Sequence, residues 1–127
     1  MPSPILKQGD VLIVSILDSL SDKDFLQIRD ELAERVGRLR SRGVVIDVSA
    51  VDIMDSFATR TLRGIAQTAR LRGAETVIVG IQPEVAFSMV KLGLSLEGVT
   101  TSLDLEEGLA YLDRKGKAHD QEVRTHR

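Results

Sequence analysis

The fold of this chain is decided by residues 43–63, which read GVVIDVSAVDIMDSFATRTLR. The stretch begins with a short β-branched run, Val44 to Ile46, which predicts a buried strand in a parallel sheet. A polar turn follows, and from Ala58 onward apolar residues recur at helical spacing. Ser56 is therefore expected at or next to the first residue of a helix. Unpaired backbone N–H groups and the helix dipole stabilise a negative charge at such a position.

The residues before this stretch predict a hairpin and a helix. Two apolar runs, residues 5–7 and 11–17, flank a Gln-Gly-Asp sequence that is typical of a tight turn. Ser21 is the expected N-cap of a long amphipathic helix, with aspartates in its first turn facing the helix dipole. Gly43 is expected to end that helix.

The residues after the central stretch predict further alternation of strands and helices. Residues 76–79 form a second β-branched run, and Pro83 is expected to open a helix that Gly93 ends. A weak strand near residues 98–100 precedes a last helix that includes Leu112. This order predicts an α/β fold with a mostly parallel central sheet, an antiparallel strand at the N-terminus and about four helices.

Length and composition indicate one domain without disulfides. The chain has 127 residues, no Cys and no Trp, so its core must consist mainly of Leu, Val, Ile and Ala. The missing Cys also excludes a thiol nucleophile and a thiolate metal site. The N-terminal apolar run is too short to span a bilayer, so a cytoplasmic protein without membrane contact is expected. The domain is predicted over residues 1–113. Residues 114–127 lack apolar periodicity and are predicted to be a disordered or frayed tail.

Three other patterns suggest chemistry but are incomplete. Asp47, Asp52 and Asp55 surround the end of the central strand, as the Mg²⁺ ligands of a receiver domain do. The acidic pair and the late lysine of a receiver are missing, so turn-forming and capping aspartates are the favoured interpretation.

Both histidines, His119 and His126, lie in the predicted tail, which disfavours a catalytic or metal-bound histidine. Arginines on the central helix lack interleaved aromatics, so nucleic-acid binding is not expected. No phosphate-binding glycine motif is present, and no cofactor is predicted.

Ser56 admits two interpretations from the residues alone. A serine at the start of a helix is usually a cap, whereas an exposed hydroxyl there also suits a phosphate. Asp55 can provide the cap instead, which would leave the Ser56 hydroxyl for modification. On a helical wheel Ser56, Arg60 and Arg63 share one exposed face. Phe57 also lies off the buried stripe, and either packs against the neighbouring turn or offers a docking contact.

The segment VVIDVSAVDIMDSFATR resembles the signature of STAS domains, the fold of anti-sigma factor antagonists. The resemblance covers residues 5–113. It includes the strand VIVG with its proline-opened helix and the segment LGLSLEGVTTSLDLEEGLAYL. In that family an Asp-Ser pair leads into a helix, and a dedicated kinase phosphorylates the serine. The resemblance therefore implies that Ser56 is the phosphate acceptor. Thr59 is a second candidate by its position one turn away, not by the resemblance.

Within the family the chain is similar to the small single-domain subunit of the bacterial stressosome. The resemblance implies a non-enzymatic phospho-switch and scaffold that sequesters a serine-protein switch kinase and releases it when Ser56 is phosphorylated. The implied partners are this kinase, larger sensor STAS subunits in a large assembly, and further copies of the chain. The residues expected to contact partners are Asp55, Phe57, Thr59, Arg60 and Arg63. The alternative is a stand-alone anti-sigma factor antagonist that binds an anti-sigma factor kinase and is regulated by serine phosphorylation.

Overall fold

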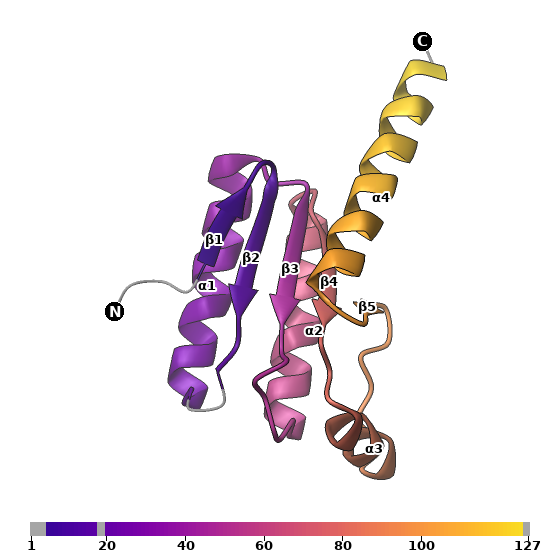
Figure 1. Ribbon diagram of the computed structural model, residues 1–127. Helices are drawn as coiled ribbons and strands as arrows, with labels where there is room; N and C mark the ends of the chain where they lie inside the picture. Colours follow the sequence, from indigo (N-terminus) through magenta and orange to yellow (C-terminus); the bar gives the residue numbers. More distant parts are fainter. Residues whose placement is uncertain (1–4, 18–19, 126–127) are drawn as a thin grey trace.

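Strands and helices alternate along most of the chain (Figure 1). The structure, a computed structural model, describes the backbone of residues 5–17 and 20–125 and the side chains as far as residue 117. Within these residues the strands are β1 (Ile5–Gln8), β2 (Val11–Ser15), β3 (Gly43–Asp47), β4 (Glu75–Val79) and β5 (Thr100–Ser102). The helices are α1 (Asp22–Leu39), α2 (Ser56–Leu71), α3 (Pro83–Lys91) and α4 (Leu105–Thr125).

The strands form one mixed sheet in the order β1-β2-β3-β4-β5. β1 is antiparallel to β2, as the predicted hairpin requires, and the other neighbours are parallel. β3 lies in the middle of the sheet, where Ile46 pairs with Val14 of β2 and with Ile78 of β4. Its apolar residues are fully buried, which confirms the predicted buried strand and the α/β fold.

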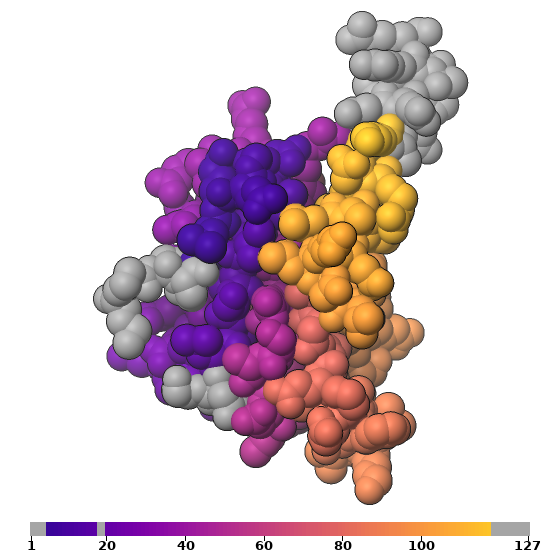
Figure 2. Space-filling view, in the orientation of Figure 1, coloured from indigo at the N-terminus to yellow at the C-terminus, as the bar shows by residue number. Residues whose placement is uncertain are grey.

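Helices lie on both faces of the sheet, and α4 packs mainly over the part formed by β3, β4 and β5. Alternate strand residues, such as Val44 and Ile46, point into a large core that they share with α1 and α2. The residues between them, such as Val45, point to the other face, where Leu112 of α4 packs on β3 and β4. Figure 2 shows the described atoms of α4, in orange to yellow, over the face turned to the viewer.

The predicted start of α1 is confirmed, but its predicted end is not. Ser21 caps the helix by accepting a hydrogen bond from the backbone N–H of Asp24, and the Asp24 carboxylate accepts one from the Ser21 N–H in return. The expected stop at Gly43 is wrong, because the helix ends at Arg40 in the left-handed conformation, with φ at 51°. Gly43 begins β3 instead, and a Cβ there would lie 2.8 Å from Leu112 Cδ1. The glycine is therefore needed for close packing of α4 on the sheet.

The last helix extends beyond its predicted end. α4 continues to Thr125, whereas the sequence predicts a helix that ends near residue 113; the disordered or frayed character of the residues that follow stays a prediction. The segment contains many good helix formers, which continue a helix without any apolar stripe. The side chain of His119 and all of His126 lie outside the described residues, and the domain boundary at residue 113 stays a prediction. Among the described residues, none of the helices combines the length and hydropathy that a bilayer crossing requires.

Candidate functional site

The strand–turn–helix junction at the end of β3 is an ordered loop. The carboxylate of Asp47, the last residue of β3, accepts a hydrogen bond from the backbone N–H of Ser49 at 2.8 Å. The Val51 N–H donates to the carbonyl of Val48 at 3.0 Å, which closes a tight turn. Val51 and Met54 are buried in the larger core, so the loop is fastened by side chains as well as by its backbone.

Asp55, rather than Ser56, caps α2. Its carboxylate accepts a hydrogen bond from the backbone N–H of Ala58 at 2.8 Å, with the extended backbone that an N-cap requires. Ser56 is the first residue of the helix, and its side chain is exposed. The prediction that Asp55 can take over the cap is therefore confirmed, and the Ser56 hydroxyl is not needed to begin the helix.

The two predicted arginines have different surroundings. Arg60 is exposed, and its Nε donates to the backbone carbonyl of Ser56 at 3.3 Å, so its guanidinium leans back toward the start of α2. Arg63 instead donates from Nη1 to the carbonyl of Ser95, in the loop between α3 and β5. The structure thus brings Arg60 to Ser56, whereas Arg63 fastens a neighbouring loop.

Phe57 and Thr59 are less accessible than the neighbouring Ser56 and Arg60. Phe57 is half-buried and packs against the larger core, in line with the packing interpretation. Thr59 is only 1% exposed, and its hydroxyl donates to the carbonyl of Asp55 at 2.8 Å. The structure therefore argues against Thr59 as a second phosphate acceptor or as a partner contact. A kinase could reach its hydroxyl only after the first turn of α2 opened.

The three aspartates at this end of the sheet act separately. Asp47 forms the turn, Asp55 caps α2, and Asp52 accepts a hydrogen bond from Gln82 Nε2 at 3.1 Å. Among the described residues, no group of three or more acidic or histidine side chains is placed to hold a metal ion. The turn-forming and capping roles of Asp47 and Asp55 agree with the favoured interpretation of the sequence.

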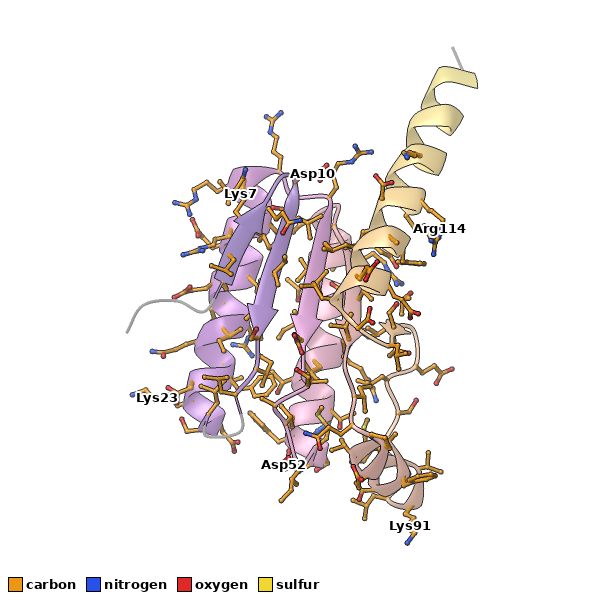
Figure 3. All side chains as sticks on the ribbon, viewed as in Figure 1. Lys7, Asp10, Lys23, Asp52, Lys91 and Arg114 are labelled. Atoms are coloured by element: carbon orange, nitrogen blue, oxygen red, sulfur yellow. The ribbon has the colours of Figure 1, made fainter. Side chains whose placement is uncertain are left out.

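Two residues at the junction were missed from the sequence. Gln82, immediately before α3, donates from Nε2 to the carbonyl of Ser49 at 2.9 Å as well as to Asp52. Ile53 lies in the same loop with its side chain in solvent. Figure 3 labels Asp52 and Lys91 at this end of the molecule, opposite Lys7 and Asp10. No local pattern indicates Gln82, because its partners are about 30 residues away and are reached only through the fold.

Comparison with known proteins identifies the family. The model of the STAS domain matches residues 4–108, which include every strand and the start of α4. This chain belongs to the STAS domain family. The prediction made from the segment around Ser56 is therefore confirmed at the level of the family.

Solved structures place this STAS domain near one branch of the family. A serine-to-glutamate variant of RsbS from Moorella thermoacetica is 37% identical, with a TM-score of 0.80, and the match covers 92% of this chain and 99% of that one. A chain in a structure of the stressosome, described as a signal integration and transduction hub, is 39% identical, with a TM-score of 0.76, over 89% of this chain and 98% of that one. The chain is thus similar in both sequence and fold to RsbS and to a stressosome component.

Curated relatives point to the same system. The RsbT co-antagonist proteins RsbRA and RsbRD of Bacillus subtilis are 28% and 29% identical over 110 and 111 residues. These matches cover 84% and 87% of this chain but only 40% of each relative. The chain therefore spans about two fifths of the length of these relatives, and the comparison concerns their STAS portion.

Proposed function

We propose that this protein is a non-enzymatic phospho-switch and scaffold subunit of a stressosome. In its unmodified form it sequesters an RsbT-like serine-protein kinase, and phosphorylation of Ser56 releases that kinase. The observation that carries the proposal is the exposed Ser56 at the first position of α2, with the capping role taken by Asp55, in a chain similar to RsbS. An exposed hydroxyl that is not required by the fold is suited to reversible modification.

The chemistry of the junction supports release on phosphorylation. A phosphate adds about two negative charges and three strong acceptor oxygens. The start of α2 favours such a charge, and the guanidinium of Arg60 already lies at the Ser56 carbonyl. A bound kinase that had packed against a neutral serine would have to desolvate these charges. A mismatch of this kind costs a few kcal/mol, or about a hundredfold in affinity.

The proposed partners follow from the relatives. RsbR-like sensor subunits carry a STAS portion similar to this chain within proteins about two and a half times as long as the matched segment. We propose that their STAS portions and further copies of this chain assemble into one large complex, to which the kinase binds. No nucleic acid or cofactor is part of the proposal.

The test is a pull-down of the organism's own RsbT-like kinase by wild type, Ser56→Ala and Ser56→Asp. Wild type and Ser56→Ala should retain the kinase, and Ser56→Asp should retain less, because aspartate supplies one charge in place of about two. Mass spectrometry of wild type after incubation with the kinase and ATP should find phosphate on Ser56. Phosphate only on Thr59 or Ser49, with equal binding by all three forms, would remove Ser56 from this role.

The size of the complex distinguishes the proposal from its alternative. Copurification of sensor STAS subunits in a large assembly supports the stressosome. A small complex with an anti-sigma factor would instead support a stand-alone antagonist; a solved structure of the anti-sigma factor antagonist SpoIIAA is available for comparison of the fold. That protein shares the fold of this chain, with a TM-score of 0.64 at 16% identity.

A further inference from the structure

One apolar side chain in the loop between β3 and α2 is directed into solvent. Ile53 is 77% exposed, three residues before Ser56, in the loop that joins β3 to α2. Its apolar neighbours Val51 and Met54 are only 6% and 4% exposed. Single exposed apolar residues are common on protein surfaces, so exposure alone assigns no function to Ile53. The surroundings of Ile53 supply the further argument.

The loop around Ile53 is held from several sides. The Ser49 N–H donates to the Asp47 carboxylate, and the side chain of Gln82 donates both to the Ser49 carbonyl and to Asp52, the residue beside Ile53. On the other side Asp55 is fixed as the cap of α2. A side chain presented by a preordered loop loses little conformational entropy when a partner covers it. Ile53 is therefore suited to act as an anchor.

We propose that Ile53 is the apolar anchor for the kinase that modifies Ser56, and that it fills an apolar pocket beside the kinase active site. This inference rests on the proposed function. Three residues of extended chain span at most about 11 Å, whereas each partner in a standard interface contributes about 800 Å². An interface of that size centred on the Ser56 hydroxyl would extend far enough to include Ile53. The exposed Asp52 and Asp55, close to Ile53 in the chain, and Arg60, at the Ser56 carbonyl, would supply the polar rim that usually surrounds an apolar interface core.

A neighbouring STAS subunit is the less suitable occupant of this position. A permanent subunit contact over Ile53 would also cover Ser56, because the two residues are so close in the chain. The kinase could then neither bind to nor modify the serine. A partner that comes and goes is compatible with both an accessible serine and an exposed anchor.

The proposal separates the anchor from the switch. Ile53 contributes to kinase affinity whether or not Ser56 is modified, and the charge at Ser56 sets the difference between the two states. Ile53→Ala should therefore weaken kinase binding about tenfold or more, the effect of an interface hot spot. The ratio of affinities between Ser56 and Ser56→Asp forms should be retained in the Ile53→Ala background.

The experiment measures the dissociation constant of the organism's own purified RsbT-like kinase for wild type, Ile53→Ala and Leu71→Ala. Leu71 is the matched control, because it is 89% exposed at the far end of α2, about 22 Å along the helix from Ser56. Both variants should melt within a degree or two of wild type, since each loses mainly exposed surface. Only Ile53→Ala should bind the kinase more weakly.

Three results would contradict the inference, and they are distinguishable. If wild type is phosphorylated on Ser56 and Ile53→Ala binds the kinase as wild type does, the anchor is wrong and the proposed function stands. If Ile53→Ala alters the size of the assembly with sensor STAS subunits but not kinase affinity, Ile53 belongs to a subunit contact. If wild type neither binds the kinase nor is phosphorylated on Ser56, the proposed function fails together with the inference.

Discussion

A phosphate on Ser56 should be stabilised by Arg60, and the structure allows the size of the effect to be worked out. The first turn of α2 contains no acidic residue, so the helix dipole favours the new charge by about 0.3–1 kcal/mol. The carboxylate of Asp55, the preceding residue, opposes the phosphate by about 1 kcal/mol for each unit of its charge at about 4 Å in water, and the favourable effect of the dipole likewise grows with the charge. These two contributions nearly cancel, so a third charge decides whether the phosphate stabilises or destabilises the fold.

Arg60 supplies that third charge. Its Nε is already 3.3 Å from the Ser56 carbonyl oxygen, so we expect the guanidinium to reach a phosphate on the same residue by a change of side-chain rotamer. An exposed charge-assisted contact of this kind contributes up to about 1 kcal/mol. Arg60→Ala should therefore lower the free energy of unfolding of the phosphorylated form by about 1 kcal/mol, and that of the unmodified form by a few tenths.

The assay is urea unfolding of wild type and Arg60→Ala, each with and without phosphate on Ser56. The matched control is Arg70→Ala, because Arg70 lies on the same helix and also donates to a backbone carbonyl, that of Gly98, at 3.0 Å. Arg70→Ala should change both forms equally, since it is too far along α2 to contact the phosphate. Equal losses for Arg60→Ala in the two forms would refute the reasoning and would place Arg60 in packing alone.

Two further predictions concern the helices. Gly64→Ala should raise the free energy of unfolding by about 0.5–1 kcal/mol, because Gly64 lies inside α2 and an added Cβ would meet no atom within 4 Å. Gly108→Ala should lower the free energy of unfolding by about 1–3 kcal/mol, because its Cβ would lie 2.7 Å from Val79 Cγ1. Urea titration of the pair measures both, and a loss for Gly64→Ala would contradict the packing described for α2. A chain that ends at Lys117 should melt within a couple of degrees of the full chain, because it keeps Leu112, the last buried side chain described in α4. A loss of ten degrees in a calorimetric scan would show that the removed residues dock on the domain.

The features that could be predicted from the sequence are those set by neighbouring residues. The buried run of β3, the cap at Ser21 and the proline at the start of α3 each follow from a few consecutive residues, and each is confirmed. The role of Asp55 as the cap of α2 could likewise be predicted from the residues next to it. The order of the elements predicted a mostly parallel sheet with an antiparallel strand at the N-terminus, and the sheet has both features.

The errors arose where distant packing decides the outcome. Gly43 serves contact with α4 rather than the end of α1, and no pattern near it reveals Leu112 as the neighbour. The accessibility of Thr59 could have been judged better, because it lies about 60° from Leu62 on the helical wheel, inside the buried stripe. Arg63 has no local signal for its contact with Ser95, which exists only because α2 runs beside the loop after α3.

Phosphorylation of Ser56 is expected to change the surface of this protein more than its fold. The cap of α2 comes from Asp55, and the buried contacts of the junction come from Val51 and Met54, so none of them depends on the Ser56 hydroxyl. A phosphate can therefore be added and removed without unfolding the helix, whose N-terminal end favours anions. A kinase packed against the neutral serine, in contrast, must strip water from about two charges when the phosphate is present. Under the proposed function, phosphorylation is therefore expected to weaken the complex with the kinase by more than it changes the stability of the domain.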